Sequence, residues 1–531
     1  MSSPGGLATC PIALESFDVP DTLQENLKLR STGAGVTGRR ESWVSVIHRG
    51  RAPATPLDAM RSVSSLPAEA PANKVEYDWP LCYEAEKLVS RFVEAFFERN
   101  TFASSLARRM RDETGTDFFD WIDHLVVADV YRHDFEGTGY RVEVVEAPAG
   151  ITVLHHSKAM LPRVLVGSGF PDAHPVELAI RPEHVADFVA AHALGSPIEG
   201  EPLAPYRRAL VSDESGAALV AVERMAHRGF VVDANPLGRA EAVLKAREIL
   251  HTRKRRSASD EKSMQLAFAA VGEALALVGR DVTCHFFFEA ERAYWQCRNR
   301  AARMQHFRQE RLGLGWGNHD HHTFRCSRHH FVDLIELLVS LGFEKRERYY
   351  AGAEAGWGAQ ILEQPVAGIV VFADVDLMPE ETSIDFSAHR LPPSKTLRTV
   401  GLWTGLHGDS LLDAGMHHLE ARFDFDRLRD QLQGEGISTM KPFSDFEFLR
   451  QAFTEGERWP VSPIRAHRLR DTGLITPEQH DAFLRDGAIG SHLENLQRRG
   501  GFKGFNQKSV SVIISATDPR GVQEQAHAGV H

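Results

Sequence analysis

The chain has 531 residues, of which 43% are hydrophobic and 25% charged, so it can form roughly three or four domains of about 150 residues. Its formal net charge of -11 argues against a nucleic acid or an anionic membrane as partner and favours a small-molecule ligand. The five cysteines form no CxxC pair, and the sequence has neither a signal-peptide pattern nor an apolar run of about 18 residues, which predicts a cytoplasmic protein with reduced thiols.

The composition of the chain changes near residue 75. Residues 1–75 are rich in Ser, Gly, Pro, Ala and Arg without a sustained period, which predicts a flexible leader. Residues 76–250 are predicted to form an α+β lobe with mostly antiparallel strands, because the connections are short. Its predicted elements are a helix at 79–114 ended by Gly115, strands at 121–127, 140–146, 151–155, 161–166 and 176–180, a helix at 182–192, and strands at 207–211, 217–222 and 229–232.

Residues 251–313 are predicted to be a linker followed by helices. The linker contains four consecutive basic residues at 253–256, which we interpret as a solvent-exposed connector because such runs are usually solvated. Helices are predicted at 261–278 and 286–311. A second lobe is predicted at 314–515, and residues 516–531 are predicted to be a frayed tail.

The second lobe contains the order strand, helix and three strands twice. The first copy is predicted at 320–326, 331–341, 344–350, 358–362 and 368–375, and the second at 417–423, 425–432, 437–441 and 448–453, with a helical insertion around 476–486 before its final strand. Each copy begins with a histidine pair, His321-His322 or His417-His418. A duplicated unit with a histidine on its first strand can hold a metal ion between its two halves.

The residue types in the first strand suit a metal that reacts with O2. Such a metal needs few ligands on one face, and two histidines with one carboxylate meet that need. Neighbouring residues of a strand point to opposite faces, so only one of His321 and His322 can reach the interior. Arg325 shares the face of His321 and can pair with a substrate carboxylate, although a polar strand with a surface arginine is the alternative.

Several motifs of the second lobe resemble those of one enzyme family. Asp320-His321-His322-Thr323-Phe324-Arg325 resembles the Asp-His-x-x-Phe-Arg signature of the 2-oxoadipate dioxygenase/decarboxylase family, whose members are double vicinal-oxygen-chelate proteins. In the order of the family, similar segments follow at 403–408, at His417-His418, at 448–453, at 490–498 and at 498–506. The segment at 490–498 resembles a Gly-Ser-Tyr-Ile-Glu-x-x-x-Arg strand that supplies the carboxylate ligand, Glu494 here. The resemblance covers residues 314–510.

The resemblance implies both a fold and a reaction. The fold is α+β, with tandem βαβββ vicinal-oxygen-chelate units that form a half-open barrel around a metal, and with an extra N-terminal lobe. The reaction is an Fe(II)-dependent conversion of a 2-oxo dicarboxylic acid to a 2-hydroxy acid, with O2 uptake and CO2 release. The implied residues are His321, His418 and Glu494 as metal ligands, Arg325 as the catalytic and substrate-carboxylate residue, and Gln451 and Asn506 as further substrate-binding residues.

Several positions depart from the family pattern or offer alternatives. His417 stands where the family has Asn, and either His322 or His417 is an alternative ligand. Glu363 and Asp374 are alternative carboxylate ligands, and Gln451, like Gln360 on the equivalent strand, is otherwise a core amide. Cys326 is predicted to be a packed thiol.

The first lobe carries a similar pair, Asp123-His124, but Ala128 stands where an arginine is expected. We therefore predict a degenerate unit without a metal of its own. Two other functions remain open for the whole protein, a metal-dependent lyase or isomerase on the same scaffold and a metal-free small-molecule binding protein.

Overall fold

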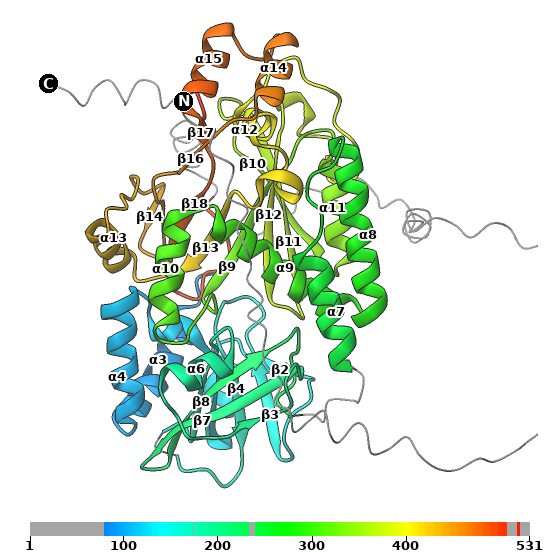
Figure 1. Ribbon diagram of the computed structural model, residues 1–531. Helices are drawn as coiled ribbons and strands as arrows, with labels where there is room; N and C mark the ends of the chain where they lie inside the picture. Colours follow the sequence, from blue (N-terminus) through cyan, green and yellow to red (C-terminus); the bar gives the residue numbers. More distant parts are fainter. Residues whose placement is uncertain (1–78, 173, 233–238, 507–517, 521–531) are drawn as a thin grey trace, which may run out of the picture. The chain divides into compact units, whose positions relative to one another are not determined.

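The computed structural model describes residues 79–172, 174–232, 239–506 and 518–520 (Figure 1). The leader predicted at 1–75 and most of the tail predicted at 516–531 lie outside the described residues. Among the described helices, none is long and apolar enough to span a membrane.

The N-terminal lobe contains an eight-stranded sheet with the order β2-β3-β4-β1-β5-β8-β7-β6. Its elements are α3 (Tyr83–Phe97), α4 (Thr101–Arg109), β1 (Ile122–Ala128), α5 (Arg132–Gly137), β2 (Arg141–Glu143), β3 (Ile151–His155), β4 (Arg163–Gly167), β5 (Glu177–Ile180), α6 (Val185–Ala191), β6 (Ile198–Glu199), β7 (Tyr206–Glu214) and β8 (Ala217–Arg224). Strand β1 pairs with β4 and strand β5 with β8, both in parallel, whereas β1 and β5 pair in antiparallel. The sheet therefore contains the βαβββ order twice, and the two copies meet at β1 and β5.

Two of the elements predicted in this lobe differ from the structure. The helix predicted at 79–114 is divided, because the Asn100 side chain accepts a hydrogen bond from the backbone N–H of Ala103 and begins α4. The strand predicted at 229–232 is wrong, since these residues form no strand. The guanidinium carbon of Arg224 lies 4.6 Å from the ring centroid of Phe230. This contact helps to bury Phe230 without pairing to a neighbouring strand.

The helices between the lobes belong to the core of the second lobe. They are α7 (Arg239–His251), α8 (Asp260–Val278), α9 (Arg280–Cys297) and α10 (Arg300–Glu310), and Figure 1 shows α8 next to α11 (Phe331–Ser340). Val271 of α8 and Phe288 of α9 share one buried cluster with Val371 of the second sheet. The prediction that the basic run at 253–256 is solvent-exposed is wrong for Arg253, which is buried and pairs with Glu291 at 2.7 Å.

The second sheet also has eight strands, in the order β10-β11-β12-β9-β13-β18-β15-β14. Its elements are β9 (His319–Arg325), α11, β10 (Glu344–Tyr350), β11 (Trp357–Gln364), β12 (Ile369–Asp376), α12 (Thr399–His407), β13 (His418–Arg422), α13 (Phe425–Gly434), β14 (Ser444–Phe446), β15 (Leu449–Phe453), α14 (Pro463–Asp471), α15 (Pro477–Asp486) and β18 (His492–Arg498). Strand order and direction repeat those of the first sheet, with β9 parallel to β12 and β13 parallel to β18. The predicted α+β fold with tandem βαβββ units is confirmed.

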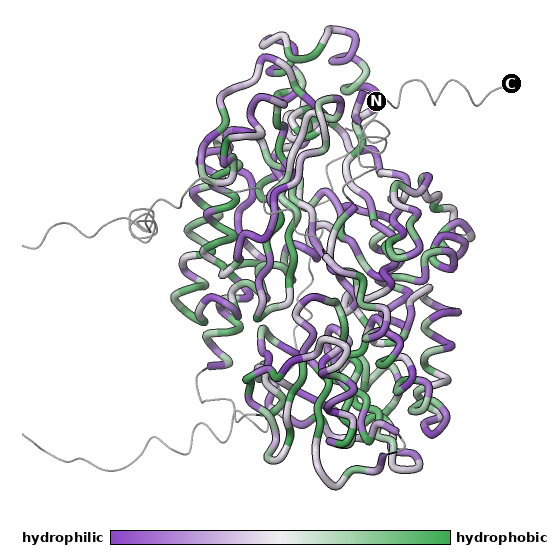
Figure 2. The backbone as a smooth tube through the Cα atoms, turned by 180° about the vertical axis from the view of Figure 1, so that it is seen from behind, coloured by the Kyte–Doolittle hydropathy of each residue, from purple (hydrophilic) through white to green (hydrophobic). Residues whose placement is uncertain are grey.

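One strand of the second unit lies later in the chain than predicted. Residues 437–441 form no strand beyond an isolated bridge between Thr439 and Thr454, and the strand is β14. Pro442 separates this segment from β14, because proline has no N–H to donate to a ladder. Figure 2 shows the hydrophobic residues, in green, along the strands of the first sheet and along the helices beside the second.

Candidate metal centre

A cavity opens on one face of the second sheet. Its lining comes from β9, the strands β10 to β12, the strands β13, β15 and β18, and short segments next to β14 and β18. The polar and charged lining residues are His321, Thr323, Arg325, Asp374, His418, Glu420, Gln451, Glu494 and Asn506, and the aromatic ones are Tyr349, Trp357, Phe372, Phe443, Phe453 and Phe505. All six residues predicted for the site thus lie around one cavity.

Two histidines and two glutamates converge inside this cavity. His321 Nε2 lies 3.3 Å from Glu420 Oε1, and His418 Nε2 lies 3.6 Å from Glu494 Oε2 and in contact with Glu420 Oε1. One ligand atom each from His321, Glu420 and Glu494 lies within 4.8 Å of the others. The four side chains are almost completely buried. This donor set fits a divalent transition-metal ion, which imidazole and carboxylate ligands bind well.

Strand register explains why these residues meet. Strands β9 and β13 pair His321 with Glu420, and strands β13 and β18 pair Glu420 with Glu494. Paired residues on adjacent strands point to the same face, and His418 shares that face because it lies two residues before Glu420. Three strands whose sequences are far apart therefore present their polar side chains at one point.

A buried ion pair orients His321. Its Nδ1 lies 3.0 Å from Asp320 Oδ1, and Arg498 donates two hydrogen bonds to the Asp320 carboxylate at 2.9 and 3.1 Å. Burial alone would raise the pKa of Asp320, but the charge of Arg498 and the hydrogen bond from His321 lower it, so the carboxylate is ionised. An anionic partner on Nδ1 holds the proton there and leaves Nε2 free to bind a metal.

The other donors are oriented in a similar way. Gln451 donates a hydrogen bond to Glu494 Oε1 at 2.7 Å, which directs this carboxylate within the cavity. Burial lowers the pKa of His321 and that of His418, so both imidazoles are neutral, the form that binds metal. Thr323 donates to Glu420 Oε1 at 2.8 Å, whereas the buried Glu420 Oε2 has no hydrogen-bond partner among the described residues.

Arg325 extends into the same cavity as a cation with free donors. Its side chain is buried, and its Nε and Nη1 atoms have no hydrogen-bond partner among the described residues. The nearest carboxylate oxygen is Asp374 Oδ2, 3.8 Å from Nε, and burial raises the pKa of Asp374 to about 8. Asp374 is therefore mainly protonated at neutral pH and leaves the charge of Arg325 available to an anionic ligand.

Of the alternative ligands, Asp374 lines the cavity beside Arg325, whereas His322, His417 and Glu363 do not line it. His322 points to the opposite face and packs against Phe288 at 4.9 Å between ring centroids, as expected from strand alternation. His417 packs against Trp403 at 5.3 Å. Gln360 and Glu363 do not line the cavity. Gln360 donates to the backbone carbonyl groups of residues 347 and 361, and Glu363 pairs with a lysine at 2.9 Å.

Glu420 was not among the predicted site residues. The signal was present in the sequence, because Glu420 lies two residues after His418 and strand alternation places both on one face. The contact with His321 additionally requires the antiparallel pairing of β9 with β13, which a single strand sequence does not reveal.

Comparisons with known proteins find similarity in structure only. No protein-family model matches the sequence, and no curated protein matches it. Among solved structures, a triple mutant of 4-hydroxymandelate synthase from Streptomyces coelicolor is 14% identical, with 77% of this chain and 99% of that chain covered and a TM-score of 0.24.

Two further structures illustrate the range of similar proteins. A xylose isomerase-like TIM barrel/4-hydroxyphenylpyruvate dioxygenase fusion protein is 11% identical, with 81% of this chain and 57% of that chain covered and a TM-score of 0.23. Methylmalonyl-CoA epimerase from Mycobacterium tuberculosis is 14% identical, with 34% and 88% covered and a TM-score of 0.19. The family expected from the sequence motifs stays a prediction.

Proposed function

We propose that the protein is an Fe(II)-dependent dioxygenase that converts a 2-oxo dicarboxylic acid to a 2-hydroxy acid, with uptake of one O2 and release of one CO2. The observation that carries this proposal is a single cavity that contains two histidines, two buried glutamates and the free guanidinium donors of Arg325. The motifs that resemble the 2-oxoadipate dioxygenase/decarboxylase family support it.

In this proposal the metal ligands are His321, His418 and Glu494. Two neutral imidazoles and one carboxylate leave a divalent ion with net positive charge and with open positions for other ligands. Bound Fe(II) would supply the O2 chemistry and attract an anionic 2-oxo acid. Asp320 keeps His321 in the tautomer that binds, and Gln451 holds the Glu494 carboxylate.

Arg325 binds the distal carboxylate of the substrate. A guanidinium with unused donors in a buried cavity forms short, bidentate hydrogen bonds with a carboxylate, and such charge-assisted bonds are about twice as strong as neutral ones. Because the pKa of Asp374 is raised to about 8 by burial, this neighbour does not neutralise Arg325 at pH 7. The aromatic side chains of the lining pack around the carbon skeleton of the substrate and exclude water from it.

A metal-dependent isomerase or lyase is the second candidate, and Glu420 is the observation that favours it. This buried carboxylate lies next to the proposed ligands and has a free Oε2, so it is placed to accept or donate a proton. A reaction of that kind moves a proton without consuming O2, whereas the dioxygenase uses O2 in a fixed ratio to substrate.

An oxygen-uptake experiment tests the proposal. The full chain is purified without oxygen, loaded with Fe(II), and mixed with 2-oxo acids that have or lack a distal carboxylate. We expect one O2 consumed and one CO2 released per 2-oxo dicarboxylate, and no uptake with the His418→Ala variant. Turnover without O2 consumption would favour the isomerase or lyase, and protein that retains no metal would favour the metal-free binding protein.

A further inference from the structure

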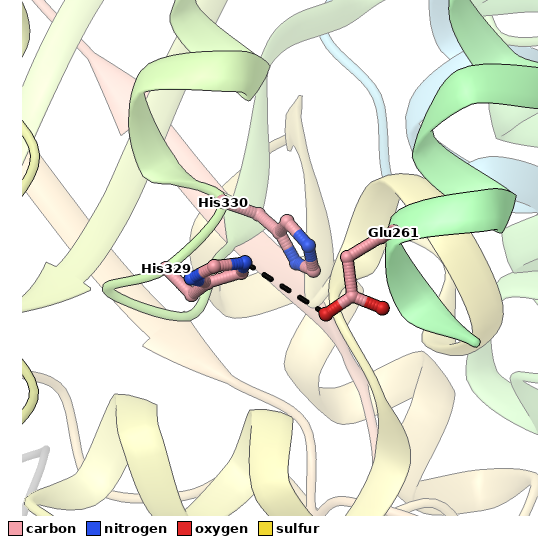
Figure 3. Close-up of side chains that lie close together, drawn as sticks. All are labelled: Glu261, His329 and His330. Carbon is pink, nitrogen blue, oxygen red and sulfur yellow. Dashed lines mark ion pairs between the residues drawn. The ribbon is translucent and has the colours of Figure 1, made fainter.

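A second group of metal-ligating side chains lies outside the cavity, at the end of β9. Figure 3 shows Glu261, from the first turn of α8, facing His329 and His330, from the turn between β9 and α11. One ligand atom from each of the three lies within 4.8 Å of the others, and His329 Nε2 is 3.8 Å from Glu261 Oε1. None of the three lines the cavity.

His330 is already oriented as a ligand. It is 4% exposed, its Nδ1 lies 2.7 Å from Asp409 Oδ2, and its Nε2 has no hydrogen-bond partner among the described residues. In the neutral ring, with the Nδ1 proton donated to Asp409, Nε2 presents a buried lone pair, which costs free energy unless a cation or a donor satisfies it.

Asp409 is in turn fixed by the turn that carries the histidines. Its Oδ1 accepts a hydrogen bond from the backbone N–H of Ser327 at 2.6 Å, and its Oδ2 accepts one from the Ser327 hydroxyl at 3.0 Å. A ligating histidine backed by a hydrogen-bonded carboxylate is the usual arrangement around protein-bound metal ions.

The remaining two side chains are accessible from solvent. The side chains of His329 and Glu261 are 64% and 61% exposed, so an ion reaches them directly and they can rotate to close around it. Two imidazoles and one carboxylate with water in the fourth position suit tetrahedral Zn²⁺.

We propose that Glu261, His329 and His330 form a second divalent-cation site, separate from the cavity and selective for an ion of the Zn²⁺ type. A bound ion joins the start of α8 to the turn after β9. Ser410, which follows Asp409, accepts a hydrogen bond from the backbone N–H of Arg325 at 2.9 Å. The ion therefore stabilises the same segment that supports the end of β9.

Zinc binding to the full chain tests this site. Protein stripped with a chelator is incubated with Zn²⁺, passed through a desalting column and analysed for metal. We expect His329→Ala and Glu261→Gln to retain one zinc fewer per chain than the wild type, with a wild-type dissociation constant on the order of 1 μM. His133→Ala, which removes a histidine whose side chain is 92% exposed, is the matched control and should retain the wild-type amount.

A second readout separates this site from the cavity. The His418→Ala variant, which disrupts the proposed metal centre in the cavity, should still bind zinc at the second site. The result therefore does not depend on the proposed function. Zn²⁺ should raise the melting temperature of His418→Ala by on the order of 2 °C. It should leave the melting temperature of the His329→Ala/His418→Ala double variant unchanged. Equal zinc content in the wild type and in His329→Ala, or binding only above about 100 μM, would overturn the proposal.

Discussion

Each of the two sheets has one histidine that is held by the same kind of Arg–Asp ion pair. The side chains that surround this histidine differ between the sheets. In each sheet an arginine at the end of the last strand holds the aspartate that precedes the histidine. Arg498 donates to Asp320 at 2.9 and 3.1 Å, and Arg224 donates to Asp123 at 2.7 and 2.8 Å. Because both sheets contain this ion pair, we infer that it is part of the fold.

The aromatic neighbours are repeated as well. Phe505 packs edge-on against His321 at 4.8 Å between ring centroids, and Phe230 packs edge-on against His124 at 5.0 Å. Both phenylalanines follow the arginine of their sheet by six or seven residues. The segment around Phe230, which was predicted to be a strand, therefore packs against His124 as the segment around Phe505 packs against His321.

The centres differ at the positions that would bind a metal. By strand register, the first sheet has Glu177, Ala179, Val220 and Arg208 where the second has His418, Glu420, Glu494 and Gln451. Glu177 pairs with Arg208 at 2.7 Å and with His124 at 3.3 Å, so a guanidinium already satisfies this carboxylate. The proposed chemistry of the second sheet therefore depends on a few central side chains, and the two sheets can be compared residue by residue.

The largest expected effect is loss of the metal from the second sheet. Replacing His321, His418 or Glu494 by Ala should remove Fe(II) and lower activity by about 1,000-fold or more, because a metal ion contributes several kcal/mol to the transition state. Metal analysis and circular dichroism of each variant check this result. If all three variants keep full iron, the ligand assignment is wrong.

Arg325 should affect the substrate and leave the metal bound. Arg325→Ala should lower kcat/KM for a 2-oxo dicarboxylate by about 100- to 1,000-fold, the equivalent of about 3–4 kcal/mol, within the range for a broken buried pair. Arg325→Lys keeps the charge but not the bidentate geometry, so it should recover only part of the activity. Wild-type steady-state kinetics in both variants would contradict this role.

The duplicated ion pairs offer a matched experiment. Arg498→Ala and Arg224→Ala should each lower the free energy of unfolding by about 3–5 kcal/mol, since each leaves a buried aspartate unpaired. Only Arg498→Ala should also weaken iron binding, by about 10- to 100-fold, because only Asp320 orients a proposed ligand. Urea denaturation and iron titration measure the two quantities. If Arg224→Ala weakened iron binding as much as Arg498→Ala does, the predicted difference between the two sheets would be wrong.

The pH dependence of stability should reveal the ion pair at the centre of the first sheet. Burial alone would raise the pKa of Glu177, but His124 and Arg208 lower it to about 2 from 4.5. This stabilisation is complete above the unfolded pKa and is lost as pH falls from about 4.5 to about 2. Glu177→Gln should be less stable than the wild type by on the order of 3 kcal/mol at pH 7. The two urea midpoints should converge near pH 2, and a constant difference across this range would refute the ion-pair account.

The smallest expected effect is that of His124→Ala on iron. The first sheet lacks the register equivalents of Glu494 and Arg325, having Val220 and Ala128 there, so the variant should retain as much iron per chain as the wild type. Any change in activity should follow a change in stability. A lower iron content in purified His124→Ala would mean that the first sheet binds metal.

Local patterns were sufficient to predict most elements of the second sheet. The strand at 344–350 and the faces of His321 and His322 follow from a period of two residues, which depends only on the extended backbone. The strand predicted at 437–441 shows the limit, because the observed strand, β14, begins later, at Ser444 and after Pro442.

By itself the sequence determined which residues share a strand face, which helices end at glycine, and the repeated order of strands and helices, because these depend on chain geometry over a few residues. Only the tertiary structure decided that Glu420 lies between His321 and Glu494, that Arg208 pairs with Glu177, and that Glu261 faces His329. These contacts join residues separated by about 30 to 100 positions. Their energies depend on strand pairing and on helix packing against the sheet, which no local sequence pattern specifies.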